Sequence, residues 1–315
     1  MQEIRAFKQS ELVLKVSDVY DTNMLDYAAW QPFVDKLCGD RVYQKDAIKN
    51  AIIYLASKNY GTLKNLVEEN YFKNACLRDK YLSLDNFLDS VQMSEKLFAN
   101  IDLATGTGKS YVMYGISQIA LGLGLVKRVL VLCPTLTIES ELINKFEILS
   151  SDSELKACIP QNAACKNPSI VSANQTVSAG DMCVENIHAV YESTGSSIDD
   201  SFLKTGHDTL VLNDESHHIF NKLSDDASIK KWKEFLLNEK YGFKYMLGFT
   251  GTAYIGDEYF PDVIYRYSLR QAIEDHIVKN IDYVTEDESK NDNERFQKIY
   301  QNHCANVKKY GLVKP

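Results

Sequence analysis

Six short apolar runs recur along this chain, and each ends in a turn or a cluster of polar residues. Apolar runs of this length are short for helices and are typical of strands buried on both faces. Helical patterns lie between them, as at residues 109–121 and 138–149. This alternation predicts an α/β fold with a mostly parallel sheet covered by helices on both faces. The predicted strands are 98–103, 128–134, 169–174, 182–187, 209–216 and 245–252.

A further helix is predicted upstream of the first strand, over residues 42–58. Its apolar residues recur at helical spacing and would lie on one stripe of an amphipathic helix. The stripe comprises Val42, Ile48, Ala51, Ile52 and Leu55. By contrast, the polar segments 150–168 and 192–208 are predicted to be surface excursions, and 286–294 to be a solvated linker or the start of a helix.

Composition narrows the class of protein. Apolar residues make up 45% of the 315 residues and charged residues 25%, as in ordinary globular proteins, and no apolar run is long enough to cross a bilayer. The first residues lack the pattern of a secretory signal, so we expect a cytoplasmic protein without a membrane partner. The seven cysteines form no CxxC pair, which favours reduced thiols. A net charge of −8 does not exclude a local groove for a nucleic acid.

The segment LATGTGKSYVMYG, 103–115, places glycines, a lysine and hydroxyls between a predicted strand and a predicted helix. Such a turn lets backbone N–H groups converge on a phosphate, while the lysine reaches the outer phosphates and the serine hydroxyl binds Mg²⁺. The strict pattern requires glycine at position 103, where this chain has Leu103. A turn that only caps a helix is the alternative. The predicted nucleotide-binding residues are Thr105, Gly106, Thr107, Gly108, Lys109 and Ser110.

An acidic pair, Asp214 and Glu215, follows the predicted strand LVLN. In open α/β sheets, ligands bind at the carboxyl ends of the strands. We therefore expect Asp214 to hold Mg²⁺ and Glu215 to polarise the attacking water, unless the pair only solvates a loop. No cysteine or spaced histidine accompanies His217 and His218, so a coupling role for His217 is favoured over metal binding.

A third group, Thr250, Gly251 and Thr252, ends the last predicted strand. Its hydroxyls could connect a nucleotide to a neighbouring site, although the group alone could equally be an ordinary turn. In order along the chain, the phosphate loop, the acidic pair with histidine and the Thr-Gly-Thr group are far more specific than any one of them.

This ordered set resembles superfamily 2 helicases and translocases, and in particular the restriction subunits of type III and type I restriction enzymes. The resemblance rests on ATGTGKS at 104–110, DESH at 214–217 and TGT at 250–252. It implies a P-loop NTPase fold of the RecA type, ATP and Mg²⁺ as cofactors, and ATP hydrolysis that drives movement on DNA. Gln44 matches the glutamine with which that family recognises adenine, although Gln44 could also lie on the solvated side of its helix.

The resemblance also implies contacts to the nucleic-acid backbone, with double-stranded DNA as the expected partner. They fall in three segments, CPTLTIESEL, SANQT and ENIHAVY. Turn or capping roles remain open for each of these residues. The residues concerned are Pro134, Thr135, Asn174, Gln175, Asn186 and His188. In a restriction-modification system, methyltransferase or specificity subunits would be further partners.

The resemblance covers residues 42–284. It divides the chain into a helical extension at 1–40, a first RecA-like ATP-binding domain at 41–278, and a linker with the start of a truncated second domain at 279–315. No motif of a second motor lobe is found, so we expect this fragment to hydrolyse ATP weakly. Ser216 stands where the family usually has alanine.

Other functions are open at this stage. A nucleotide-gated nucleic-acid-binding module without turnover would need the same residues, and a P-loop kinase would leave the DESH and TGT groups without a purpose. A metal-dependent nuclease is suggested by Pro261-Asp262 followed by Glu288-Ser289-Lys290. Its second element would have to lie in a strand, and EDESKNDNE has no apolar residue to bury.

Overall fold

The structure is a computed structural model that describes residues 7–172, 175–187, 201–220, 227–279, 289 and 291–310. The chain divides into two compact units, residues 1–278 and 279–315. In the second unit, the described helix is α14 (Asp292–Tyr310). The first unit contains the sheet and the candidate site described below.

A sheet of seven strands in the order β3-β4-β2-β5-β6-β1-β9 forms the centre of the first unit, and every pairing in it is parallel. All six predicted apolar runs form strands. The strand β9 was not predicted. The bounds are β1 Leu97–Leu103, β2 Arg128–Cys133, β3 Ser169–Val171, β4 Asp181–Asn186, β5 Thr209–Asp214, β6 Tyr245–Thr250 and β9 Val263–Tyr267. A separate antiparallel pair joins β7 (Tyr254–Ile255) to β8 (Glu258–Tyr259).

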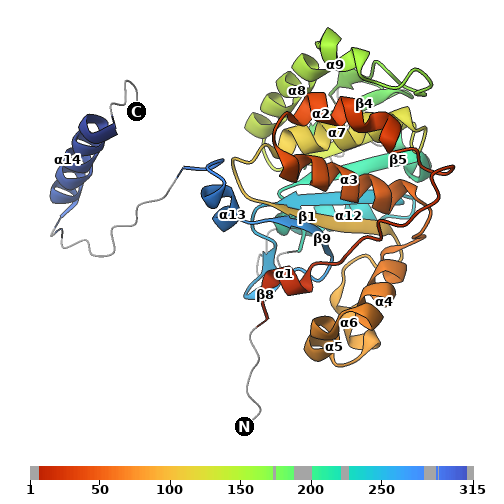
Figure 1. The fold of residues 1–315 in the computed structure, drawn as a ribbon, viewed down its shortest axis with the longest axis horizontal. Helices are drawn as coiled ribbons and strands as arrows, with labels where there is room; N and C mark the ends of the chain where they lie inside the picture. The colour runs from red at the N-terminus through yellow and green to blue at the C-terminus, as the bar shows by residue number, and fades with distance from the viewer. Residues whose placement is uncertain are drawn as a thin grey trace. The chain divides into compact units, whose positions relative to one another are not determined.

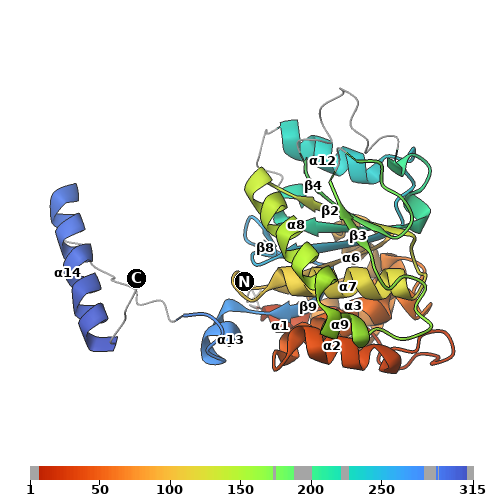
Figure 2. The same cartoon turned by 90° about the horizontal axis from the view of Figure 1, so that it is seen from above.

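Helices cover both faces of the sheet, as Figures 1 and 2 show, with α12 on one side and α2, α3 and α7 on the other. The predicted α/β fold with a parallel sheet is confirmed. The main helices are α2 Gln31–Cys38, α3 Val42–Ala56, α4 Leu63–Lys73, α7 Lys109–Gly122, α8 Leu136–Ser151 and α12 Ala227–Leu237. Shorter ones are α1 Gln9–Leu12, α5 Ala75–Tyr81, α6 Leu84–Ser90, α9 Ser153–Ala157, α11 His217–Phe220 and α13 Leu269–Glu274.

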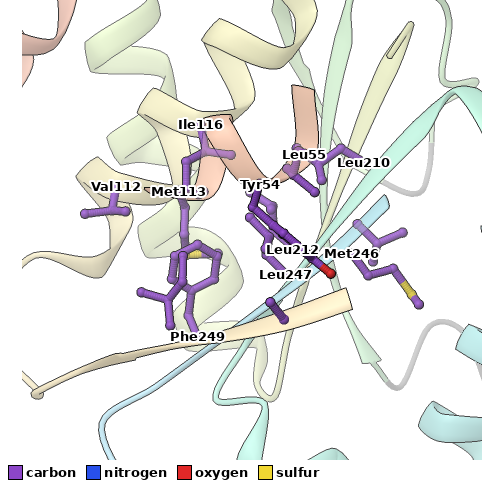
Figure 3. Close-up of a cluster of buried hydrophobic side chains, with 14 of the residues drawn as sticks. Tyr54, Leu55, Val112, Met113, Ile116, Leu210, Leu212, Met246, Leu247 and Phe249 are labelled. Carbon is purple, nitrogen blue, oxygen red and sulfur yellow. The ribbon is translucent and has the colours of Figure 1, made fainter. Parts of the chain in front are cut away.

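The core lies between the sheet and helices α3 and α7 (Figure 3). Tyr54 is fully buried there, and its hydroxyl donates a hydrogen bond to the carbonyl of Phe98 at 2.9 Å. Each large apolar side chain buried in this way stabilises the fold by roughly 1.5–3 kcal/mol. The labelled side chains are Tyr54, Leu55, Val112, Met113, Ile116, Leu210, Leu212, Met246, Leu247 and Phe249.

Helix α7 approaches α2 and α3 closely because two of its residues are glycines. A Cβ at Gly115 would lie 2.7 Å from Ile48 and 2.9 Å from Leu37, and a Cβ at Gly122 would overlap the ring of Trp30. Helix α3 is buried on more sides than its predicted stripe, since Ile53 and Tyr54 are covered as well. The prediction for Val42 is wrong: this first residue of α3 is 63% exposed.

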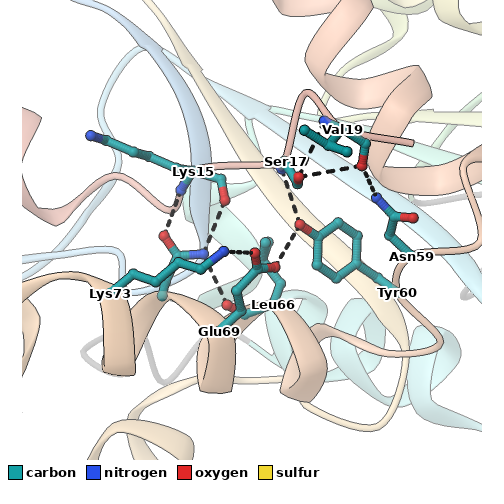
Figure 4. Close-up of polar contacts among 9 residues, drawn as sticks. Lys15, Ser17, Val19, Asn59, Tyr60, Leu66, Glu69 and Lys73 are labelled. Carbon is teal, nitrogen blue, oxygen red and sulfur yellow. Dashed lines mark hydrogen bonds and ion pairs between the residues drawn. The ribbon is translucent and has the colours of Figure 1, made fainter.

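The segment before α2 packs against β9 and α4 within the first unit. The backbone N–H of Leu14 donates to the carbonyl of Val263 in β9. Both backbone groups of Lys15, which is labelled in Figure 4, form hydrogen bonds with the Asn70 side chain of α4, at 2.7 and 3.1 Å. Tyr60 connects the backbone of Ser17 to Glu69. Residues 8–38 therefore contribute to the same core as the sheet.

The described part of the predicted surface excursion 192–208 is partly buried: Ser201, Phe202 and Gly206 are covered, whereas residues 203, 204 and 207 are exposed. Phe202 is fully buried, with its ring 6.3 Å from that of Phe243, and a Cβ at Gly206 would lie 2.5 Å from the backbone of residues 241 and 243. The prediction is wrong for these residues, because a polar segment can still anchor itself through one aromatic side chain. Residues 192–200 of the same excursion lie outside the described residues.

Replacing Gly122 by alanine tests the helix packing. The added methyl must displace the Trp30 ring, so we expect Gly122→Ala to lower the free energy of unfolding by about 1–3 kcal/mol. Gly61→Ala is the control, because its added Cβ has a single neighbour, at 3.4 Å. Urea denaturation of the three proteins decides the outcome. Equal stability of Gly122→Ala and wild type would contradict the packing described here.

Candidate functional site

The phosphate loop joins the end of β1 to the start of α7. Gly106 and Gly108 have φ angles of +83° and +81°, which glycine adopts without strain. Gly108 is the N-cap of α7, so Lys109 and Ser110 form the first turn of a 14-residue helix. The backbone therefore has the concave shape and the helix N-terminus that bind an anion in other proteins.

Two residues of α3 fix this loop by hydrogen bonds to its backbone. The Tyr43 hydroxyl and Gln44 Nε2 both donate to the carbonyl of Thr107, at 2.9 and 2.7 Å. Gln44 is only 1% exposed, so the alternative that it lies on the solvated side of its helix is wrong. Its Oε1 is buried and accepts no hydrogen bond from the described residues. A buried acceptor of this kind usually receives a hydrogen bond, and a bound group could supply the donor.

The loop threonines differ from each other. Thr107 is 1% exposed, and its hydroxyl donates to the carbonyl of Ala104 at 2.6 Å, so its side chain stabilises the turn itself. Thr105 is exposed and lies against Gly251 of the Thr-Gly-Thr group, where a Cβ would be 3.0 Å from the Thr105 nitrogen. The missing side chain at Gly251 thus allows close contact between the two groups.

The acidic pair lies at the end of β5, and its two residues differ in backbone conformation. Asp214 is the last residue of the strand, whereas Glu215 has a φ of +51°, in the left-handed region that few residues other than glycine adopt. Lys109 forms an ion pair with Glu215, and its Nζ lies 3.8 Å from Asp214 Oδ1. Asp214 Oδ1 is buried and has no hydrogen-bond partner among the described residues.

Burial and charge act oppositely on these two acids. Burial raises the pKa of Asp214, and the nearby charge of Lys109 offsets only part of the effect. Burial would also raise the pKa of Glu215, but hydrogen bonds from His217 and Lys109 and their charges outweigh it and lower the pKa to about 2. Glu215 is therefore ionised at any physiological pH, as a residue that orients a water must be.

The histidine after the acidic pair joins it to the Thr-Gly-Thr group. His217 Nδ1 lies 3.3 Å from Glu215 Oε2 and 2.9 Å from the Thr250 hydroxyl. Thr250 Oγ1 in turn accepts the backbone N–H of Thr252 at 3.0 Å. A change at Glu215 can thus reach the end of β6 through two contacts.

All three groups contact one another in pairs. The strands that carry them, β5, β6 and β1, are neighbours in the sheet and parallel, so their carboxyl ends meet at one edge. A pocket of about 410 Å³ opens beside this edge. Its lining includes Gly106, Gly108, Lys109, Ser110 and Asp214, together with Glu141 and Lys145 of α8.

Comparison with known protein families identifies the chain. The model of the family described as type III restriction enzyme, res subunit, matches residues 38–255, more than half of the 315 residues. The chain belongs to this family. The parallel sheet with a phosphate loop after β1 agrees with the expected P-loop NTPase fold.

Solved structures similar to this res-family chain are distant in sequence. The type ISP restriction-modification enzyme LlaGI, bound to a DNA substrate mimic, has 13% identity and a TM-score of 0.43 over 75% of this chain and 20% of its own. The DNA-bound type ISP enzyme LlaBIII has the same identity and TM-score, over 75% and 15%. The UvsW helicase of bacteriophage T4 has 14% identity and a TM-score of 0.35 over 59% and 58%.

This res-family chain thus spans a fifth or less of the first two of these structures. Comparison with curated proteins gives no match. Among the described residues, no helix is long and apolar enough to cross a membrane.

The residues expected to contact a nucleic acid are only partly described. Pro134 and Thr135 follow β2 at the same edge of the sheet as the phosphate loop, and Thr135 caps α8 by accepting the N–H of Ile138. Gln175 Oε1 accepts the N–H of Ser172 at 3.2 Å. Asn174 and His188 lie outside the described residues.

Asn186 is the member of this set whose side chain faces inward. It is 5% exposed, and its Nδ2 donates to Glu139 of α8 at 2.6 Å and to Glu185 at 3.1 Å. The bond to Glu139 attaches the start of α8 to β4. A contact from Asn186 to a nucleic acid stays a prediction, and it would require this bond to open.

The nuclease alternative does not fit the position of Asp262. This residue is 1% exposed, and its Oδ1 accepts a hydrogen bond from Asn100 Nδ2 at 2.7 Å. Glu288 and Lys290 lie outside the described residues. The described ranges also contain no group of three or more His, Cys, Asp or Glu residues that could hold a metal ion. His217 and His218 form no such group.

Several polar residues near the site were not predicted. Asn213, just before Asp214, is fully buried, and its Oδ1 accepts the indole N–H of Trp232 at 3.1 Å. Asp102, at the end of β1, accepts hydrogen bonds from Tyr259 and Arg266, both at 2.9 Å. Asn100, Asp102 and Asn213 each interrupt an apolar strand, and this interruption is the sequence signal that would have found them.

The buried carboxyl group of Asp262 predicts a pH-dependent stability. Burial raises its pKa to about 6 despite the hydrogen bond from Asn100. An acid whose pKa is raised on folding favours the fold when protonated, so its contribution is lost as the pH rises from about 4 through 6. The raised pKa means that the free energy of unfolding falls by about 3 kcal/mol when Asp262 ionises.

Asp262→Asn removes this titration. We expect the melting temperature of the variant, relative to wild type, to increase between pH 4.5 and pH 7.5. Thermal unfolding followed by circular dichroism at both values measures the difference, and exposed Asp257→Asn controls for a surface charge. A difference that does not change with pH would show that Asp262 is not the group described.

Proposed function

We propose that this chain is the ATP-binding and ATP-hydrolysing first lobe of an ATP-dependent DNA translocase of a restriction-modification system. The observation that carries the proposal is the set of pairwise contacts among the phosphate loop, the acidic pair with His217 and the Thr-Gly-Thr group. Three groups with separate roles in one reaction have to meet at one bound molecule. The family supports the restriction context.

The residues present fit a nucleoside triphosphate with Mg²⁺. The left-handed glycines and the start of α7 form an anion cradle, and Lys109 points across it toward the acids. Gln44 Oε1 and Asp214 Oδ1 are buried oxygens without hydrogen-bond partners in the described chain. Gln44 Oε1 would accept a hydrogen bond from the adenine amino group, and Asp214 Oδ1 would hold Mg²⁺ together with Ser110. Bound Mg²⁺ neutralises phosphate charge during phosphoryl transfer.

The side chains of this lobe then divide the work of hydrolysis. Lys109 and the loop amides bind the β- and γ-phosphates, and Glu215 orients a water for in-line attack. Lys109 is paired with Glu215 here, so binding the phosphates requires Lys109 to exchange a carboxylate for a phosphate. That exchange frees Glu215 to accept a hydrogen bond from the water.

In this proposal, His217 and Thr250 couple the release of Glu215 from Lys109 to the residues that contact DNA. His217 contacts both Glu215 and the end of β6, so movement of the carboxylate alters the support of Thr250. Pro134, Thr135 and Gln175, with Asn174, Asn186 and His188, are proposed to contact the DNA backbone. In the whole enzyme, a second motor lobe would close on this one and turn each cycle into a step along double-stranded DNA. Methyltransferase or specificity subunits are proposed as further partners.

Two substitutions separate ATP binding from hydrolysis. Lys109→Ala removes the cation of the cradle, and we expect it to abolish binding of ATP with Mg²⁺. Glu215→Gln removes the carboxylate that competes for Lys109, so we expect tighter ATP binding and hydrolysis lowered by at least ~10²-fold. Isothermal titration calorimetry and single-turnover hydrolysis measure the two quantities.

Lys64→Ala, an exposed lysine of α4, is the control and should match wild type in both assays. Wild-type affinity in Lys109→Ala would contradict the nucleotide site. Binding by wild type without any hydrolysis would instead support a nucleotide-gated module that does not turn over.

DNA binding by this lobe should depend strongly on salt. A single lobe contacts mainly backbone phosphates, so two or three contacts predict a roughly tenfold or greater loss of affinity between 50 and 200 mM salt. Fluorescence anisotropy with two duplexes of unrelated sequence measures this, and both should give the same curve. Affinity that is constant across these salt concentrations would argue against a phosphate-contacting surface.

A further inference from the structure

Three buried polar side chains, connected by hydrogen bonds, form a chain across the sheet beside the acidic pair. Ser216 Oγ lies 2.7 Å from Asn100 Oδ1, and Asn100 Nδ2 lies 2.7 Å from Asp262 Oδ1. None of the three residues is more than 1% exposed. They come from the turn after β5, from β1 and from the residue before β9. The residues on either side of Asn100 and of Asp262 are apolar.

The direction of these hydrogen bonds is fixed by the carboxylate at one end. An ionised carboxylate only accepts hydrogen bonds, so Asn100 must turn its NH₂ group toward Asp262. Its carbonyl oxygen then faces Ser216, and the serine hydroxyl has to donate. Asp262 thereby determines which hydrogen-bonding group Ser216 meets, although the two residues are not in contact.

The backbone makes room for this chain. Gly248 of β6 pairs with Asn100 in the sheet, and a Cβ there would overlap Asn100 Oδ1 and lie 2.6 Å from Ser216 Oγ. On the other side of Asn100, the pairing of β1 with β9 shifts register between Asn100 and Ile101. Such irregularities redirect side chains. The backbone N–H of Asn100 also donates to the Asp262 carbonyl at 2.9 Å.

The upper end of the chain lies next to the strained residue of the site. A residue other than glycine in the left-handed region costs of order 1–3 kcal/mol and persists only where its surroundings impose it. Glu215 is held on one side by Asp214 at the end of β5. On the other side, Ser216 is fixed twice, since its N–H donates to the Phe249 carbonyl at 2.9 Å and its hydroxyl to Asn100.

We propose that Ser216, Asn100 and Asp262 are positioning residues that hold Glu215 in the backbone conformation from which its carboxylate contacts Lys109 and His217. The inference rests on the ATPase function proposed above, because it concerns the same carboxylate. In this chain a hydroxyl at position 216 adds a side-chain bond that an alanine there cannot make.

A double-mutant cycle on ATP hydrolysis tests this proposal in the 315-residue protein. Ser216→Ala and Asn100→Ala should each lower kcat about tenfold without raising the KM for ATP, because Glu215 orients water and its contact with Lys109 competes with the nucleotide. The double variant should fall no further than the worse single variant, since both substitutions break one chain. Multiplied effects, or a rise in KM without loss of kcat, would overturn the proposal.

Ser117→Ala is the matched control. Ser117 is also fully buried, and its hydroxyl donates to the Met113 carbonyl within α7 at 2.8 Å. A general cost of removing a buried hydroxyl would lower stability in both serine variants, whereas only Ser216→Ala should lower kcat. If Ser216→Ala does not fold, Ser216→Cys keeps the size of the side chain with a weaker donor and should lower kcat in the same way.

A crystal structure of Ser216→Ala gives a readout that does not require hydrolysis. We expect Glu215 to leave the left-handed region and to lose its contact with Lys109. An unchanged Glu215 would refute the positioning role even if the protein is an active ATPase. Conversely, absence of hydrolysis in wild type would end the proposed function, while a shift of Glu215 in the variant crystal would still support the role of Ser216.

Discussion

The contact between Lys109 and Glu215 is the interaction on which the rest of the site depends. It joins the loop after β1 to the turn after β5, two strands that are separated by β6 in the sheet. Because all three strands are parallel, a single edge brings together residues more than one hundred positions apart. The same contact helps to keep Glu215 ionised against the effect of burial. The order of the strands thus brings the two side chains close together, and the charge of Lys109 stabilises the ionised carboxylate of Glu215.

The sequence was sufficient to predict the parts of the fold that repeat a simple rule. Continuous apolar runs bounded by turns identified six of the seven strands of the sheet, because a strand buried on both faces cannot carry many polar residues. The run VIYRY of β9 breaks that rule with Arg266, whose charge is paired with Asp102. No pattern within β9 indicates this partner, since Asp102 lies in β1. Likewise, Phe202 anchors a polar segment by one contact that periodicity does not register.

The candidate site was predictable for a different reason. Phosphate binding needs glycines, a lysine and a hydroxyl at fixed spacing, so ATGTGKS is informative without any knowledge of its neighbours. Residues that support such groups have no required spacing. Tyr43 donates to a carbonyl of the phosphate loop, and Asn100 accepts a hydrogen bond from the Ser216 hydroxyl. These partners meet only once the chain has folded. A polar residue inside an apolar strand indicates only that a partner exists somewhere.

The strained backbone of Glu215 and the buried carboxyl group of Asp262 are connected by hydrogen bonds. Glu215 adopts a conformation that an isolated turn would avoid, and Asp262 keeps a carboxyl group in an apolar interior where burial opposes its charge. Either feature alone would lower the stability of the fold and would not position any side chain of the site. Connected through Asn100 and Ser216, the buried acid fixes an amide, the amide fixes a hydroxyl, and the hydroxyl fixes the residue that follows Glu215. An apolar replacement of that chain could pack as well, but it would leave the turn after β5 held by its backbone hydrogen bonds alone.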